Sequence, residues 1–140
     1  MSILVDVAEA VVAHLNEPPL GFTAQRTYLP AFKLEELEEL HVTVAPISQT
    51  ISQATRDSQY FDCVVHVAVQ QKVAPQVLAQ MDVLVALVET VIDRLRGQRL
   101  PALPDAVPAA ISHEVAFSDE HLDKFRVFSS LVSATYRVRR

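Results

Sequence analysis

The chain has 140 residues, and its 17 acidic and 12 basic side chains give it a formal net charge of -5. A chain of about this length can bury a core of its own, so we expect a single domain over residues 1–140. The acidic balance disfavours proteins that grip the DNA backbone, because that binding depends on clustered Lys and Arg. The single cysteine, Cys63, excludes an intrachain disulfide and a zinc site built from several thiolates.

Nucleotide-binding and membrane-spanning signatures are also missing from the sequence. The 2 glycines, Gly21 and Gly97, are too few for the glycine-rich loops that cradle nucleotide phosphates. Asp6 and Glu9 interrupt the apolar N-terminal residues, and no apolar stretch reaches the roughly 18 residues that span a bilayer. We therefore expect neither a secretion signal nor a membrane association.

The first predicted element is an amphipathic helix over residues 3–16. Apolar residues recur there at steps of three and four, at Ile3, Leu4, Val7, Ala8, Val11 and Leu15. Ser2 is placed to cap this helix, and the pair of prolines that follows it forbids continuation. Thr and aromatic residues then predict a strand over 22–29, and leucines spaced among glutamates predict a short helical turn over 33–40.

Two strands with a long polar segment between them come next. The segment His41–Ala45 is predicted to be a brief strand that Pro46 ends, because proline has no N–H for the ladder. A strand over 61–69 places its odd-numbered apolar residues on one side. The segment between them, Ile47–Gln59, is rich in Ser, Gln and Thr and longer than the usual hairpin loop of roughly two to five residues. We expect it to be a projecting arm or a flexible loop.

The longest predicted helix covers residues 75–96 and ends at Gly97. Its apolar stripe consists of Val77, Met81, Leu84, Val88, Ile92 and Leu95, widened by Leu78, Val83, Val85, Leu87 and Val91. So wide a stripe indicates a helix that has core on two sides or offers one side to another chain. The remaining predicted elements are an extended connection at 100–108, a strand at 110–117, a polar turn at 118–124 and a closing strand at 125–138.

The predicted element order is α-β-(short α)-β-β-α-β-β. Helices separated by runs of adjacent strands favour an α+β architecture over a regular βαβ winding. We therefore expect a mixed, mainly antiparallel sheet packed by the N-terminal helix and the long central helix.

Side chains suited to catalysis are sparse in this sequence. Cys63 lies among valines of a predicted core strand, which indicates a buried structural thiol. Potential metal ligands cluster locally at His113-Glu114 and in the run from Asp119 to Asp123, which a turn could bring around a divalent ion. The alternative is a solvated turn, and the glutamates within 35–39 are expected to face water.

Polar and basic residues at two distant places in the chain are the candidate interface. Arginines alternate with Val138 at the end of the closing strand and project from it, either to meet acids on a neighbouring subunit or to aid solubility. The candidate residues are Ser48, Gln49, Thr50, Ser52, Gln53, Arg56, Asp57, Arg137, Arg139 and Arg140.

Several runs of scaffold residues carry a family resemblance. These runs are RTYLP at 26–30, VTVAP at 42–46, VAVQQK at 67–72, RLRGQRL at 94–100 and YRV at 136–138. With the acidic turn at 33–40 and the polar segment after Pro46, they resemble the small tail-completion proteins of tailed bacteriophages and prophages, and specifically the tail-terminator group.

That resemblance implies a structural role in the virion, with no catalytic residue, metal or cofactor. In related proteins six copies form a ring that caps the tail tube, stops its growth and presents a docking face to the head–tail connector. The implied partners are therefore other copies of this chain in a hexameric ring, the tail tube protein and the head–tail connector protein. The implied location is the tail or neck of the virion, after assembly in the cytoplasm of a bacterial host. The acidic balance suits a lumen through which DNA passes without specific binding, because a wall that does not attract phosphates lets the polymer slide.

Three other functions stay open at this point. The first is another neck or head-closure protein of the phage connector. The second is a small enzyme that uses a metal held by His113, Glu114, His121 and Asp123, or the thiol of Cys63. The third is an adaptor domain that binds one protein partner through the acidic turn 33–40.

Overall fold

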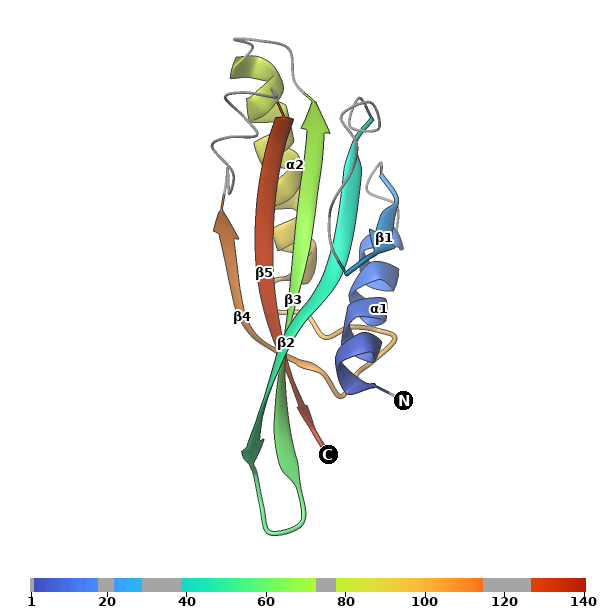
Figure 1. Cartoon of the computed structure of the whole chain (residues 1–140), viewed down its shortest axis with the longest axis vertical. Coiled ribbons are helices and arrows are strands. Elements are labelled where there is room, and N and C mark those ends of the chain that lie inside the picture. The colour runs from blue at the N-terminus through green and yellow to red at the C-terminus, as the bar shows by residue number, and fades with distance from the viewer. Residues whose placement is uncertain (1, 18–21, 29–38, 73–77, 115–126) are drawn as a thin grey trace.

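The computed structural model describes residues 2–17, 22–28, 39–72, 78–114 and 127–140 (Figure 1). Within these residues the elements are α1 (Ile3–Asn16), β1 (Ala24–Arg26), β2 (His41–Gln53), β3 (Gln59–Lys72), α2 (Leu78–Leu95), β4 (Val107–Glu114) and β5 (Val127–Arg139). The α+β class and the order of the described elements are confirmed. The predicted short helical turn falls largely, and the polar turn at 118–124 entirely, outside the described residues.

The helix α1 has the predicted bounds. The Ser2 side chain accepts a hydrogen bond of 3.2 Å from the backbone N–H of Val5, which satisfies one of the free donors at the helix start. At the other end the N–H of Glu17 donates to the carbonyl of Ala13. The face formed by Val7, Val11 and their neighbours is fully buried, as the three- and four-residue spacing predicts.

The five described strands form one sheet in the order β1-β2-β3-β5-β4. The strand β1 is parallel to β2, and the other neighbours are antiparallel. The predicted strand at 22–29 is observed only at Ala24–Arg26. Its first residue is bracketed by the Asn16 amide, which donates to the carbonyl of Ala24 and accepts from its N–H.

The prediction that Pro46 ends a brief strand is wrong. The strand β2 continues from His41 to Gln53, and its register against β3 shifts between Pro46 and Ser48. A proline is tolerated at such a bulge because the regular hydrogen bonding between the strands is interrupted there, and proline has no N–H to donate. The connection to β3 therefore contains only Ala54–Ser58, and the predicted flexible loop is a hairpin.

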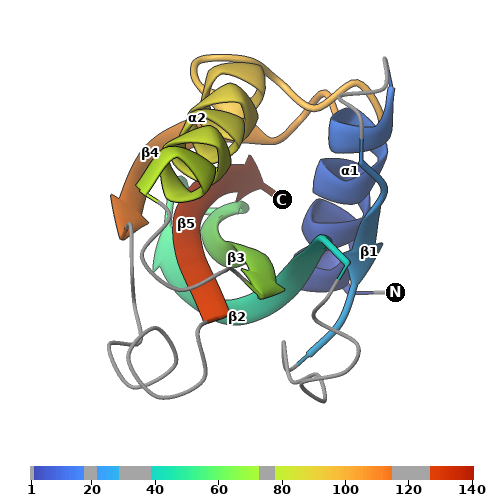
Figure 2. The same cartoon turned by 90° about the horizontal axis from the view of Figure 1, so that it is seen from above.

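Both helices pack on one face of the curved sheet (Figure 2). The predicted alternation of β3 is confirmed, because Cys63, Val65, Val67 and Val69 are all fully buried in the cluster beneath the helices. The helices are joined by a reciprocal pair of contacts: Arg94 donates to the carbonyl of His14 at 3.0 Å, and Nε2 of His14 lies 3.0 Å from the carbonyl of Arg94.

The central helix α2 packs most of its predicted apolar stripe against the core, with Met81, Val85, Leu87 and Ile92 partly buried there. Leu84, Val88, Val91 and Leu95 are buried, whereas Val83 is 69% exposed, so within this chain the apolar stripe has core on the sheet side and leaves Val83 uncovered. As predicted, Gly97 follows the end of the helix, and its φ of 67° explains why a glycine stands there.

Two predictions for the second half of the chain also differ from the structure. The connection after α2 is not extended, because Leu103 donates to the carbonyl of Leu100 and Ala106 to that of Leu103, so the chain turns twice. Strand β4 accordingly starts at Val107 instead of residue 110 and ends at Glu114. Strand β5 runs from Val127 to Arg139, close to the predicted 125–138.

Candidate interface on the projecting arm

The outer part of the β2–β3 hairpin projects beyond both helices (Figure 1). Every residue from Ile47 to Gln53 is exposed, whereas the preceding residues of β2 from Val42 to Pro46 are buried. We use the term arm for residues 47–63 of this hairpin together with residues 136–140, which pair with it. The predicted projecting arm is therefore confirmed, as ordered strands.

A compact turn closes the arm at its tip. The N–H groups of Ala54 and Thr55 both donate to the carbonyl of Ser58 at 3.1 Å, and the hydroxyls of Thr55 and Ser58 are 2.7 Å apart. The candidate residues Gln53, Arg56, Asp57 and Arg140 line a common pocket beside this turn.

The end of β5 lies along the hairpin and brings the two distant candidate segments together. Arg137 lies directly opposite Asp62 in the register, and backbone hydrogen bonds of 2.7 and 2.9 Å join Gln59 to Arg140. All ten candidate interface residues of the sequence therefore lie on the arm. Ser48, Thr50 and Ser52 face away from the helices, and Gln49 and Gln53 face the helix side, as their opposite partners on β3 show.

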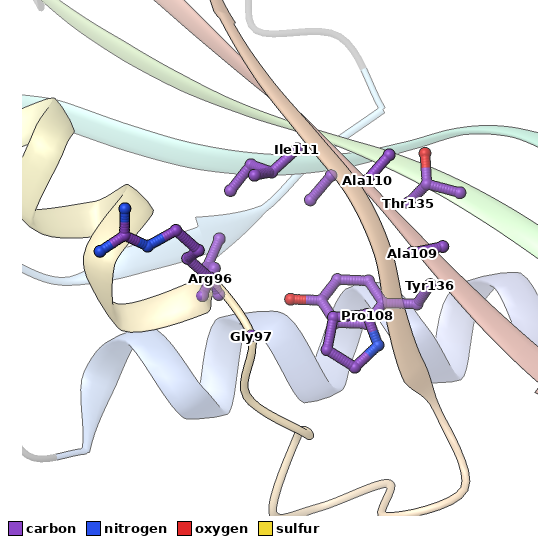
Figure 3. A pocket seen from close by; sticks show the side chains of 10 residues that line it. Arg96, Gly97, Pro108, Ala109, Ala110, Ile111, Thr135 and Tyr136 are labelled. Atoms are coloured by element: carbon purple, nitrogen blue, oxygen red, sulfur yellow. The ribbon is translucent and has the colours of Figure 1, made fainter.

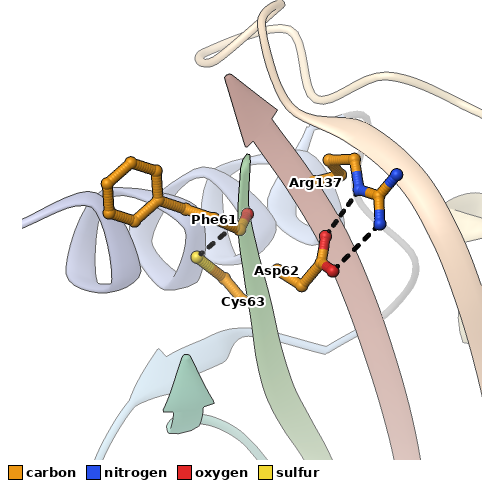
Figure 4. Close-up of polar contacts among 4 residues, drawn as sticks. All are labelled: Phe61, Asp62, Cys63 and Arg137. Atoms are coloured by element: carbon orange, nitrogen blue, oxygen red, sulfur yellow. Dashed lines mark hydrogen bonds and ion pairs between the residues drawn. The ribbon is translucent and has the colours of Figure 1, made fainter. Parts of the chain in front are cut away.

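A forked ion pair organises the face of the arm that points away from the helices (Figure 4). Nε and Nη2 of Arg137 lie 2.8 and 3.1 Å from the two carboxylate oxygens of Asp62. The guanidinium holds the pKa of the Asp62 carboxyl below its usual range through these hydrogen bonds, and the carboxylate raises the pKa of Arg137. The same guanidinium lies 4.5 Å from the ring centroid of Tyr60, a cation–π distance. A surface ion pair of this kind adds little stability, and this one also fixes the orientation of both groups.

The other two arginines also find partners within the chain. Nε of Arg139 donates to the hydroxyl of Ser58 at 3.1 Å, and Arg140 forms an ion pair of 2.9 Å with Asp105. The sequence left open whether these arginines meet acids on a neighbouring subunit or aid solubility. The structure shows that Asp62 and Asp105 of the same chain neutralise two of them, while Arg139 contacts a neutral hydroxyl.

The thiol of Cys63 is fully buried at the base of the arm, which confirms the prediction of a structural cysteine. Gln49 donates to its sulfur at 3.7 Å, and the thiol itself points to the carbonyl of Phe61 at 3.9 Å (Figure 4). Burial raises the pKa of the thiol, so the reactive thiolate is disfavoured.

The predicted metal ligands are only partly described. Nε2 of His113 lies 2.8 Å from the hydroxyl of Ser130, and that hydroxyl donates to the carbonyl of Glu114 at 3.0 Å. His121 and Asp123 fall outside the described residues, within which no three His, Cys, Asp or Glu side chains come together as metal ligands. Of the acidic turn, Glu39 is described and is exposed.

Sequence reasoning missed several features of this site. Tyr60 and Asp62 belong to it through their contacts with Arg137, and the signal for them was the polar residues that alternate with the buried ones at the start of β3. The exposed apolar residues Ile47 and Ile51 were also missed, since an isoleucine in a polar segment does not by itself indicate exposure.

Comparisons of this chain with protein-family models and with curated protein sequences found no match. Among the described residues, neither helix combines the length and the apolar character needed to cross a membrane.

Proposed function

We propose that this chain is a structural subunit of a bacteriophage virion, a tail terminator whose copies form a ring on the tail tube and join it to the head–tail connector. The observation that carries the proposal is the arm, a three-stranded extension that gathers the candidate interface residues from two distant segments. Its residues Cys63, Tyr136 and Val138 belong to the buried cluster, whereas every residue from Ile47 to Gln53 is exposed.

An extension of this kind is suited to binding. Ordering a residue costs roughly 1–2 kcal/mol of backbone entropy, and the exposed residues of β2 bury little that offsets this cost within one chain. Contacts with a neighbouring subunit would supply the missing burial. A ring is built by one patch meeting a different patch on the next copy, and the arm and the body of the chain provide two such patches.

The proposed partners follow from this arrangement. One face of the ring meets the tail tube protein, the other meets the head–tail connector protein, and DNA passes through the lumen without specific binding. The ring is proposed to be hexameric, on the resemblance of the sequence to tail terminators, and to reside in the tail or neck of the virion.

A shortened arm tests the proposal. Gln49 and Cys63 lie directly opposite each other, so residues 50–62 can be replaced by Asn-Gly, the preferred two-residue hairpin turn. The shortened chain should keep the circular dichroism spectrum and melting behaviour of a folded body. By light scattering and electron microscopy the wild type should form rings and the shortened chain should not.

Particles assembled with each chain extend the test to the virion. With the shortened chain we expect tails of uncontrolled length that carry no heads. Tails of normal length that fail to join heads would favour a head-closure protein, and normal particles would refute the role of the arm.

A further inference from the structure

One edge of the sheet is left without the usual protection against pairing. Among the described residues β1 pairs only with Val42 to Val44 of β2, and the last bond between them runs from the N–H of Thr27 to the carbonyl of Val44. No described strand covers the outer edge of Ile47–Gln53. This stretch, ISQTISQ, contains no charge, proline or glycine. Natural edge strands are normally guarded by charges, prolines or bulges along their length. Here Pro46 and the register shift before Ser48 lie at the start of the stretch, so the uncharged edge from Ser48 to Gln53 is the pairing surface.

The opposite edge of the same sheet is β4. Pro108 and a register shift between Pro108 and Ala110 interrupt its start, its pairing with β5 is regular from Ala110 to Glu114, and its direction matches. Strand β2 is antiparallel to β3, β3 to β5, and β5 to β4, so β2 and β4 run in opposite directions. When a second copy is placed beside the first by a rotation that continues the sheet, β2 of one copy meets β4 of the next as an antiparallel pair. Such a contact is head-to-tail and can close into a ring.

The side chain of Ile51 points to the helix side of the sheet. Ile51 lies opposite Phe61, and Phe61 lies opposite Val138, which is buried in the cluster beneath the helices. Directly opposite residues project from the same face of a sheet. Ile51 is nevertheless 54% exposed, and all its neighbours on the outer part of β2 from Ile47 to Gln53 are exposed too.

An apolar pocket opens on that same face at the β4 edge (Figure 3). Its volume is about 270 Å³, and it lies between the end of α2 and strands β4 and β5. Its lining includes Leu95, Arg96, Pro108, Ile111, Ala134 and Tyr136. Burial raises the pKa of the Tyr136 phenol to about 12, which keeps the group neutral, so an apolar occupant meets no charge from it.

We propose that the β2 edge of one copy, residues 47–53, adds to the β4 edge of the next copy as an antiparallel strand, and that Ile51 enters the pocket beside the end of α2. This inference rests on the proposed ring, and it assigns the two surfaces that form it. Because the sheet is continuous across the contact, the helix-side residue Ile51 is carried to the helix side of β4, where the pocket lies.

The levels of the two surfaces define the geometry of the ring. Ile51 lies in the same row of directly opposite residues as Val138 of β5. The pocket lies beside Ala134 to Tyr136 of β5, which are two to four positions away along that strand. For Ile51 of one copy to reach the pocket of the next, neighbouring copies must therefore be shifted along the strands. A stagger of this kind is what tilted strands require when a sheet closes on itself.

Disulfide trapping in solution tests the contact. The variant carries Ile51→Cys and Ala109→Cys, both at exposed positions, while the native Cys63 is fully buried. With diamide as the oxidant, each pair of thiols passes two electrons and two protons to diamide and forms a disulfide. The double variant should give a covalent ladder in denaturing gels. The single variants should not, and neither should Ser52→Cys with Ala109→Cys, because residue 52 projects from the other face.

A second pair of variants measures the pocket contact without cysteines. Ile51→Asn removes the apolar side chain and should weaken each subunit contact roughly tenfold or more, seen by light scattering on dilution. Ser52→Asn, the neighbouring control on the opposite face, should leave the assembly within about twofold of wild type.

The outcomes separate this inference from the proposed function. The wild type could form rings while the cysteine pair gives no covalent ladder and Ile51→Asn assembles normally. This result would overturn the proposed strand pairing but not the proposed ring. Dimers trapped by Ile51→Cys alone would overturn it in favour of a symmetric β2–β2 contact. A wild-type chain that stays monomeric even at millimolar concentration would overturn both.

Discussion

The burial of Val88 offers a quantitative test of how α2 packs on the sheet. Val88 is fully buried between α2 and the sheet, and Val83 of the same helix is 69% exposed. Val88→Ala removes two methyl groups, worth about 0.8 kcal/mol each on transfer, and leaves a cavity that raises the loss to roughly 2–3 kcal/mol. Alanine stabilises a helix relative to valine by up to about 0.6 kcal/mol, and Val83→Ala has the same gain.

The two variants are matched, so their difference isolates burial. In urea unfolding followed by circular dichroism, Val88→Ala should lower the free energy of unfolding by about 2 kcal/mol with an unchanged m-value. Val83→Ala should leave it unchanged or slightly raised. For 140 residues the unfolding entropy is about 0.3 kcal/mol/K, so the melting temperature of Val88→Ala should fall by roughly 7 °C. Equal stability of the two variants, measured at one protein concentration, would show that α2 does not face the sheet as described.

Three further predictions concern the arm and the helix end. Because the pKa of Asp62 is lowered in the fold, its contribution to stability is present above the unfolded pKa of about 3.8 and is lost as the pH falls through the lower folded value. The stability of Asp62→Asn should therefore fall less than that of the wild type as the pH is lowered. If the urea midpoints of the wild type and of Asp62→Asn changed identically with pH, the pairing of Asp62 with Arg137 would be contradicted. Gly97→Ala should lower the free energy of unfolding by about 1 kcal/mol, measured by thermal melts. A Cβ at this position has no neighbour within 4 Å, so the cost comes from the φ of 67°, which strains residues that carry a Cβ. Gly97→Asn should cost less, and an alanine variant as stable as the wild type would argue against this backbone conformation. Cys63, fully buried, should react with a thiol reagent only as fast as the protein opens, so immediate labelling of the native chain would place the thiol at the surface instead.

The error at Pro46 shows where reasoning from the sequence reached its limit. A proline lacks the N–H that a central strand needs, so it reads as the end of a strand. In the fold the register of β2 shifts just after Pro46, and the pairing with β3 continues from Ser48. Whether a strand residue needs a backbone N–H to donate depends on its partner in the neighbouring strand. The sequence around Pro46 does not show where that partner lies.

The candidate interface was predictable in its parts but not in its assembly. The polar segment 47–59 and the arginines after Tyr136 stand out in composition alone. Their meeting depends on the pairing of β3 with β5, which brings Asp62 to Arg137 across 75 positions of the chain. The exposure of Ile51 and the pocket on the β4 edge depend in the same way on where the helices end above the sheet.

Local order in this protein follows from the chain itself. The spacing of apolar residues, the cap at Ser2 and the glycine at position 97 determine α1 and the end of α2 almost to the residue, because these signals act within a few positions of one another. Strand limits, the shape of the arm and the surfaces offered to a partner were decided only by the tertiary structure. They arise from hydrogen bonds and burial between distant segments, and such contacts exist only once the sheet has formed.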